Sequence, residues 1–224
     1  MNPLYMTDSY LREFSAVVSE VDGTHVALSQ TAFYPNGGGQ PADFGSIMSE
    51  NGIFNVVNVI KKSGEIWHEV TAEGLKVGDS VTCTIDWERR YRLMRMHTAA
   101  HILDAVFHKA TGALATGNQL GVDKSRIDFS LEALDKEKIN SYIEEANRIT
   151  ESGIEVKVYF LKREEALKIP GVVKLANAMP PEVAELRIVE IPGVDIQADG
   201  GTQVKNTKEI GKIVLLSVEN RGKN

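Results

Sequence analysis

The stretch from Arg89 to Thr111 contains neither glycine nor proline, and this absence predicts one uninterrupted helix over residues 88–110. Within it His97 and His101 are four residues apart, so both side chains lie on the same helical face. Two imidazoles at this spacing can bind one transition-metal ion, and the small residues between them leave room for another element. The alternative is that both histidines are packed or solvated without an ion.

The part of the chain before this helix is rich in short alternating strands. Gly23, Gly64 and Gly78 mark turns between them. Several short strands joined by glycine-bearing turns are typical of a small β-barrel. The predicted strands cover residues 13–20, 25–28, 53–60, 66–70 and 80–86.

The remainder of the chain mixes helices and strands without regular βαβ spacing, which favours an α+β fold. We therefore predict two domains, a β-barrel over residues 1–86 and an α+β core over residues 87–224 in which the long helix packs against an antiparallel sheet. Asp135 is expected to cap a second helix that ends before Gly153. The predicted elements of this part are helices 88–110 and 135–151, a helical turn at 163–167, and strands 118–122, 126–130, 154–161, 186–191 and 212–218.

Composition excludes some functional classes. The net charge of −6 argues against indiscriminate nucleic-acid binding, although it permits a local basic patch. The apolar runs are too short for a transmembrane helix, and no secretory signal is visible. The single cysteine, Cys83, excludes an intrachain disulfide and is expected to be an inert core residue. These observations fit a cytoplasmic protein.

Three further motifs accompany the histidine pair. The first is Asp199-Gly200-Gly201-Thr202-Gln203, followed by Asn-Thr-Lys-Glu-Ile-Gly at 206–211. The second is the glycine-rich segment 31–45, and the third is Arg-Ile-Asp-Phe at 126–129. In this order the four motifs resemble the editing domain of alanyl-tRNA synthetase. Because no aminoacylation domain fits into 224 residues, the chain is similar to the freestanding AlaX editing family, in its medium-length class.

The resemblance implies an activity. Such proteins hydrolyse the ester that joins a wrong amino acid, serine or glycine, to alanine tRNA, because binding alone discriminates poorly among small amino acids. It also implies one zinc ion per chain, mischarged alanine tRNA as the partner, and no membrane association; a monomer is the simplest expectation. The rival hypothesis is a catalytically silent homologue that binds tRNA or metal. A zinc protease is excluded because position 98 is threonine rather than the glutamate that acts as general base.

The resemblance also assigns the site residues. His97 and His101 are predicted metal ligands, and the family commonly adds a cysteine and a histidine where this chain has Asp199 and Gln203. Aspartate is an acceptable zinc ligand, whereas a neutral glutamine amide is a poor one. Asp199 is therefore expected to join the histidines and leave an open position. Gln203 is either a fourth ligand or a hydrogen-bonding group for water or substrate, and with the two histidines it makes up the predicted catalytic set.

A second predicted group binds the substrate. Gly38 and Gly39 permit positive φ angles and close approach of a ligand. Thr31 offers a hydroxyl to a serine side chain, and Gln40 and Thr202 are expected to line the pocket. The competing interpretations are a tight turn for the glycines and an ordinary strand residue for Thr31.

Basic residues precede the histidine pair at four positions, and two more follow the second motif. These side chains either contact tRNA phosphates or form a solvated helix face. At the other end, Asn220 begins what is expected to be a turn that leads to a further strand in the family. The basic residues are Arg89, Arg90, Arg92, Arg95, Lys205 and Lys208.

Overall fold

The computed structural model describes residues 2–131, 135–172 and 183–220. Its contacts divide the chain into two compact units, which are described separately. The first contains Met1–Met94, Leu120–Lys124 and Gly200–Thr202, and the second contains Arg95–Gln119, Ser125–Asp199 and Gln203–Asn224. The predicted boundary at residues 86 and 87 concerns independently folding domains and stays a prediction.

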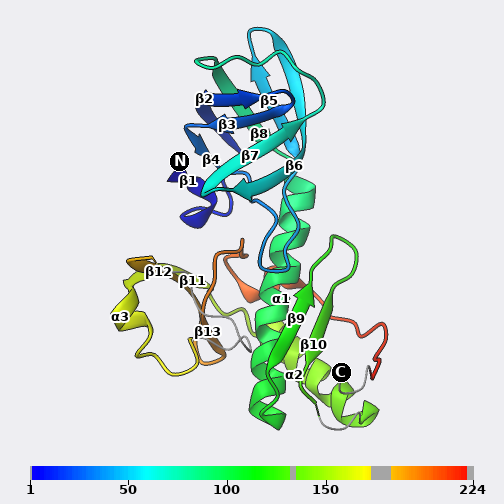
Figure 1. Ribbon diagram of the computed structural model, residues 1–224. Helices are drawn as coiled ribbons and strands as arrows, with labels where there is room; N and C mark the ends of the chain where they lie inside the picture. The colour runs from blue at the N-terminus through cyan, green and yellow to red at the C-terminus, as the bar shows by residue number, and fades with distance from the viewer. Residues whose placement is uncertain (1, 132–134, 173–182, 221–224) are drawn as a thin grey trace. The chain divides into compact units, whose positions relative to one another are not determined.

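The first unit contains a closed six-stranded antiparallel barrel, drawn in blue to blue-green in Figure 1. Its strand order is β2-β3-β7-β6-β5-β8. Side chains alternate between solvent and the barrel interior. In β8 the buried, inward-facing residues are Val81, Cys83 and Ile85. The predicted small barrel is thereby confirmed. The strands are β2 (Glu13–Asp22), β3 (His25–Leu28), β5 (Gly45–Ser49), β6 (Gly52–Lys62), β7 (Glu65–Val70) and β8 (Ser80–Ile85).

Strand β5, which the sequence did not predict, closes the barrel between β6 and β8. It begins at Gly45, where a Cβ atom would lie 2.1 Å from the carbonyl oxygen of Thr84. Only glycine therefore permits this close approach of the two strands. The sequence signal was weak because Ile47 is the one buried apolar residue of the strand. Three short elements were also not predicted: β1 (Asn2–Pro3), which pairs with β4 (Gln30–Thr31), and the 3-10 helix η1 (Leu4–Met6).

A buried polar pair and a buried thiol belong to the barrel unit. His68 is fully buried, its Nδ1 hydrogen-bonds the Val26 carbonyl oxygen at 3.0 Å, and its Nε2 lies 2.8 Å from the Thr31 hydroxyl. Because the carbonyl can only accept, Nδ1 carries the hydrogen and Nε2 accepts from Thr31. Burial lowers the pKa of His68 to about 4, against the opposing hydrogen bond to Val26. Burial also raises the pKa of the Cys83 thiol to about 12, as befits an inert core residue.

A buried ion pair fastens the glycine-rich segment to the start of the long helix α1 (Trp87–Thr111). Arg90 and Asp43 are both fully buried and make a two-oxygen contact through the Arg90 Nε, at 2.9 and 3.0 Å. The guanidinium also donates to the carbonyl oxygens of Ser9 and Ala32. Asp43 in turn accepts from the Tyr34 backbone N–H at 2.6 Å. This pair therefore sets the path of residues 32–43.

The second unit packs the later turns of α1 against a hairpin and a second helix. Phe107 of α1 stacks on Phe129, with ring centroids 4.3 Å apart, and meets the edge of Tyr142 at 5.1 Å. Asp135 caps the second helix with its carboxylate, and Gly153 ends it with a φ of 73°, as predicted. The elements are β9 (Ala115–Gln119), β10 (Arg126–Phe129) and α2 (Lys136–Ser152).

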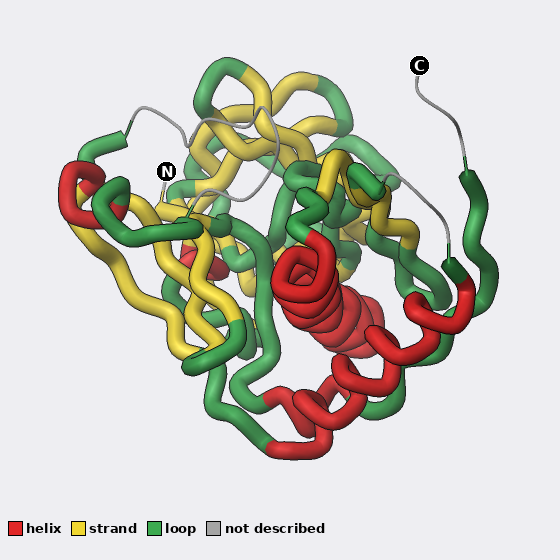
Figure 2. The backbone as a smooth tube through the Cα atoms, turned by 90° about the horizontal axis from the view of Figure 1, so that it is seen from below, coloured by secondary structure: helices red, strands yellow, loops and turns green. Residues whose placement is uncertain are grey.

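The same unit contains a three-stranded antiparallel sheet in the order β11-β12-β13. In Figure 2 the yellow strands of this sheet lie at the left, with the short red helix α3 beside them. Ala166, Leu186 and Ile188 pack on one face of this sheet. The opposite face carries Asp195 and Gln197 toward α1. The predicted α+β core with a long helix against an antiparallel sheet is thereby confirmed. The elements are β11 (Lys157–Lys162), α3 (Arg163–Ala166), β12 (Glu185–Ile191), β13 (Asp195–Ala198) and the 3-10 helix η2 (Thr207–Ile210). Among the described helices, none combines the length and apolar character needed to cross a membrane.

The predicted strand at 212–218 is wrong. The segment is irregular, and Val214 and Leu216 are 64% and 71% exposed. The Asn147 side chain of α2 bonds both the N–H and the carbonyl of Ile213, at 2.7 and 2.9 Å, in the place where a neighbouring strand would pair. The strand predicted at 118–122 begins and ends earlier, as β9 (Ala115–Gln119). The turn expected after Asn220 lies outside the described residues.

The buried His68 predicts an acid-sensitive stability. Because its pKa is lower in the folded state, the unfolded chain takes up the proton first, and stability falls as the pH drops from about 6.5 to about 4. Between neutral pH and a pH of about 5, the contribution of His68 to the unfolding free energy should fall by about 2 kcal/mol, and His68→Gln should be spared that part of the change. Urea unfolding at both pH values measures it. His25→Gln, at the edge of the barrel, is the control, and an equal acid loss in wild type and His68→Gln would contradict the prediction.

Candidate metal site

Two imidazoles of α1 form the base of the site. His97 and His101 are 4% and 6% exposed, and their rings stack with centroids 5.3 Å apart and planes inclined by 27°. The four-residue spacing places them on one face of the helix, as predicted. Because both imidazoles are buried, this face of the helix is covered rather than open to solvent.

Asp199, the first residue after β13, brings a carboxylate to both rings. Its Oδ1 lies 3.4 Å from the His97 Nε2, and its Oδ2 lies 3.9 Å from the His101 Nε2. The neighbouring strand β12 holds this residue, because the Arg187 carbonyl accepts from the Asp199 N–H at 3.1 Å and the Arg187 guanidinium donates to the Asp199 carbonyl at 2.8 Å. The Asp199 side chain is 18% exposed, which leaves one side of the cluster accessible.

The three donors could hold one metal ion. One ligand atom from each of His97, His101 and Asp199 lies within 4.8 Å of the others. Ligand atoms arranged tetrahedrally about 2.1 Å from an ion are about 3.4 Å apart, close to the separations from Asp199. Two imidazoles and one carboxylate with an open fourth position match the donor sets of catalytic zinc sites. Among the described residues, this is the group of histidine, cysteine and acidic side chains that meets the geometric requirement.

Gln203 presents the nitrogen of its amide to this cluster. Its Nε2 lies 2.9 Å from the Asp199 Oδ2 and 3.3 Å from the His101 Nε2. Its Oε1 is turned away and accepts from the Thr98 hydroxyl at 2.8 Å, while that hydroxyl accepts from the Val204 N–H at 3.1 Å. The Thr98 hydroxyl accepts from the Val204 backbone and donates its hydrogen to Gln203. This pair of bonds fixes the orientation of the Gln203 amide. In this orientation Gln203 is a hydrogen-bond donor, and its predicted role as a ligand stays a prediction.

Opposing effects set the charges in the cluster. Burial alone would lower the pKa of His101, but the carboxylates of Asp195 and Asp199 outweigh burial and raise that pKa to about 10. Burial would likewise raise the pKa of Asp199, and the charges and hydrogen bonds of His97 and His101 instead hold it well below its usual value. The cluster without an ion is therefore a tight arrangement of opposite charges, in which a cation can replace the proton of His101.

Two residues of this neighbourhood were not predicted from the sequence. Asp195 Oδ2 lies 2.9 Å from the His101 Nδ1, and Gln197 Nε2 donates to Asp104 Oδ2 at 2.8 Å. Asp195 and Gln197 alternate along β13 and so point to one face, in the direction of α1. Alternating polar residues just before the Asp199 loop were the available signal. Without the fold, they look like an ordinary solvent-facing strand edge.

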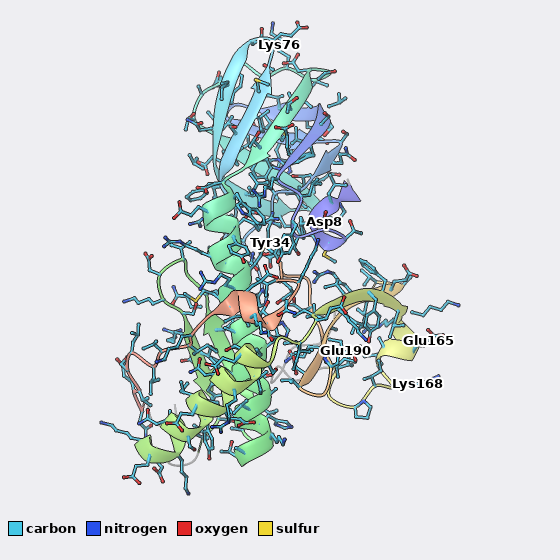
Figure 3. All side chains as sticks on the ribbon, turned by 180° about the vertical axis from the view of Figure 1, so that it is seen from behind. Asp8, Tyr34, Lys76, Glu165, Lys168 and Glu190 are labelled. Carbon is cyan, nitrogen blue, oxygen red and sulfur yellow. The ribbon has the colours of Figure 1, made fainter. Side chains whose placement is uncertain are left out.

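The predicted substrate-binding residues all belong to the first unit. Gln40 and Thr202 bond each other twice: the Gln40 amide donates to the Thr202 hydroxyl at 2.9 Å, and its oxygen accepts from the Thr202 N–H at 3.2 Å. Gly38 and Gly39 have φ angles of 58° and 80°, so the backbone conformation there requires glycine. The loop around them is closed by Tyr34, labelled in Figure 3, whose hydroxyl donates to the Gly37 carbonyl.

Thr31 belongs to β4 and is buried against the barrel residue His68. Its side chain is fully buried, its hydroxyl donates to His68, and the same oxygen accepts from the Phe33 N–H at 3.1 Å. A hydroxyl oxygen has two lone pairs, so one acceptor site is left after these two bonds. The predicted contact with a substrate hydroxyl would have to use this site, and the role stays a prediction.

Most of the basic cluster before the histidines is committed to the protein. Arg90 is fully buried, so both expectations for it, a phosphate contact and a solvated face, are wrong. Arg89 donates to the Ala42 carbonyl and covers the Phe44 ring at 3.9 Å. Arg95 donates twice to the Ile210 carbonyl, at 3.1 and 2.7 Å. Arg92 is half-exposed and pairs with two acidic side chains, Glu88 and Asp123, whereas Lys205 and Lys208 are exposed. The α1 cluster is therefore largely structural.

Comparison with known proteins gives the same assignment along nearly the whole chain. The family model described as tRNA synthetases class II (A) matches residues 6–89, and the model described as the threonyl and alanyl tRNA synthetase second additional domain matches residues 186–224. An alanyl-tRNA editing protein AlaX-M from Saccharolobus solfataricus is 51% identical over 223 residues, which are 98% of this chain and 94% of that protein. The AlaX-M protein of Methanosarcina acetivorans is 48% identical, with the same coverage of both chains.

A longer relative extends the comparison. The alanine–tRNA ligase of Pyrobaculum neutrophilum is 38% identical over 96% of this chain, which corresponds to 25% of the ligase. The chain therefore belongs to the AlaX-M family of alanyl-tRNA editing proteins. The resemblance that the four sequence motifs indicated is thereby confirmed.

The link between Thr98 and Gln203 predicts a measurable contribution to stability. In Thr98→Val the buried Val204 N–H and the Gln203 oxygen lose their partner, so the free energy of unfolding should fall by about 1–3 kcal/mol. Thr98→Ser keeps the hydroxyl and should lose clearly less. Urea unfolding of the three proteins measures the difference. Equal destabilisation by Val and Ser would show that the methyl group, and not the hydroxyl, matters at this position.

Proposed function

We propose that this protein hydrolyses the ester of alanine tRNA that carries a wrong small amino acid, serine or glycine. The observation that carries the proposal is the cluster of His97, His101 and Asp199 in a chain that is related over nearly its full length to alanyl-tRNA editing proteins. Water attacks the ester carbonyl, and the products are the free amino acid and the tRNA with its terminal hydroxyl restored. Such a reaction removes the errors that a binding site for small amino acids leaves uncorrected.

The proposed cofactor is one zinc ion per chain. His97, His101 and Asp199 would hold it, because these three groups offer nitrogen and oxygen donors at fitting separations. A bound zinc ion supplies a Lewis acid that polarises the ester carbonyl. The replacement of a thiolate by Asp199 makes the donor set harder, so the affinity for zinc should be lower than in relatives with cysteine at this position.

The protein's own groups supply orientation and hydrogen bonds. The Gln203 amide, locked by Thr98, directs its N–H groups into the cluster, where they can donate to water or to the ester oxygen. In this proposal Gln203 acts together with the histidines as part of the catalytic set. The accessible side of Asp199 is where the tRNA 3′ end would enter.

We also propose that the glycine-rich motif contributes to substrate selection. Gly38 and Gly39 expose backbone groups in a conformation other residues avoid, and Gln40 and Thr202 form a rigid polar pair. Thr31 would offer its remaining lone pair to a serine hydroxyl, an interaction that alanine cannot make. A cytoplasmic location and a monomer complete the proposal, and they are supported by the translation-related names of the relatives and by the single-chain site.

A deacylation assay tests the activity. Metal-replete protein should release serine from Ser-tRNA-Ala and leave Ala-tRNA-Ala largely intact. His97→Ala or a chelator should slow the reaction by about 100-fold or more, beyond the loss typical of groups that merely support a ligand. His108→Ala removes an exposed imidazole from the same helix and is the matched control. If every ester decays at the spontaneous rate, the protein is not a deacylase and the silent homologue is favoured.

A second assay tests the selection of serine. Thr31→Val should reduce the ratio of Ser-tRNA-Ala to Ala-tRNA-Ala hydrolysis by about tenfold, because one hydrogen bond of roughly 1.4 kcal/mol is lost. The substitution also breaks the bond to His68, so His68→Gln, which leaves the Thr31 hydroxyl in place, is measured beside it. Unchanged selectivity in Thr31→Val would remove this residue from the pocket.

A further inference from the structure

Behind the candidate ligands, polar contacts join α1 to β13 at two levels. At the first, Asp195 Oδ2 lies 2.9 Å from the His101 Nδ1, and at the second, Gln197 donates to Asp104 at 2.8 Å. The helix residues are three positions apart and the strand residues two, so one face of each element meets the other along both contacts. All four side chains are at least nine-tenths buried. The arrangement is therefore part of the packed interior.

The contact with Asp195 decides which atom of His101 faces the cluster. A carboxylate can only accept, so the Nδ1 carries a hydrogen that it donates to Asp195. The opposite ring atom, Nε2, is then the one directed at Gln203 and Asp199, at 3.3 and 3.9 Å. The Asp195 side chain is 1% exposed and also receives the Gln197 amide at 3.4 Å, so two neighbours limit its motion.

We propose that Asp195 is a positioning residue that holds the His101 ring with its Nε2 available to a metal ion, and that Gln197 holds Asp195 in turn. This inference rests on the proposed function, since it concerns the same ion site. Metal-binding histidines generally donate their second ring N–H to a carboxylate or carbonyl, which fixes the ring and makes the ligand more basic. Here a buried strand supplies that carboxylate.

A purely structural role is the competing explanation. A buried charge pair is often no more stabilising than apolar residues of similar volume, so stability alone gives little reason for a carboxylate at this position. The direction of the contact is the more telling feature. Asp195 contacts the Nδ1 of His101, which points away from the cluster. The other ring nitrogen of His101, Nε2, faces Asp199. A group that positions the ring has to lie in that place.

Cobalt titration measures the effect on the ion site directly. Co²⁺ reports binding through its visible absorption, and competition with a chelator gives the dissociation constant. Asp195→Ala should weaken Co²⁺ binding by about 10–100-fold. Asp195→Asn keeps an oxygen that can accept from the His101 Nδ1, so it should recover part of the loss. Glu190→Gln is the matched control: Glu190, labelled in Figure 3, is a carboxylate of the same sheet that bonds the Tyr159 hydroxyl.

Proton NMR of the metal-free protein provides a second readout. The bonded Nδ1–H of His101 should give a slowly exchanging resonance that is present in wild type and Glu190→Gln and absent in Asp195→Ala. Circular dichroism spectra that match the wild type show that each variant is folded. Affinity of Asp195→Ala within twofold of wild type, or an unchanged Nδ1–H resonance, would overturn the positioning role.

The outcomes separate this inference from the proposed function. A wild-type protein that binds no Co²⁺ overturns both the ion site and the role of Asp195. Normal Co²⁺ binding with no effect of Asp195→Ala overturns the inference alone. A weakened site in Asp195→Ala, in a protein that leaves all mischarged tRNA intact, overturns the deacylase proposal and supports the positioning role.

Discussion

The barrel unit depends on one buried guanidinium. Arg90 cannot lose its charge under ordinary conditions, so every polar group around it must be placed to compensate for the water it has lost. Asp43 and the carbonyl oxygens of Ser9 and Ala32 do so from three separate segments. The glycine-rich motif begins and ends at two of these segments. The shape of its loop therefore follows from the requirement that a charge in the first turn of α1 be neutralised.

The later turns of α1 perform a similar task in the second unit with weaker and more numerous contacts. Thr98 accepts a hydrogen bond from the Val204 backbone and donates one to Gln203. His101 and Asp104 bond Asp195 and Gln197, which alternate along β13. Each of these side chains has a partner that fixes its direction. A helix that contributes reactive groups must hold them more rigidly than side-chain rotation alone allows, and neighbouring strands and loops provide that constraint.

The cluster around Asp199 shows how charge and burial are balanced. Two imidazoles and two carboxylates share a region that excludes most water. The pKa of His101 is raised and that of Asp199 is lowered, because each charge stabilises its opposite more than burial disfavours it. Such an arrangement is costly without compensation and is well suited to a cation. Asp199 thus places a negatively charged donor beside the two imidazoles, and the Gln203 amide donates a hydrogen bond to it.

The sequence by itself determined the elements whose signals are local. The absence of glycine and proline predicted α1, and glycine turns and alternation predicted the barrel strands other than β5. The four-residue spacing placed His97 and His101 on one face. Contacts between distant segments were decided by the tertiary structure alone. The fold decides which surfaces come together, and three outcomes depend on it. Arg90 pairs with Asp43 rather than a phosphate, and Asp195 contacts His101 rather than solvent. Within residues 212–218, Ile213 bonds the Asn147 side chain rather than a strand. Periodicity in the sequence predicts which face of an element is apolar, but it does not predict which polar group of another segment that element will contact.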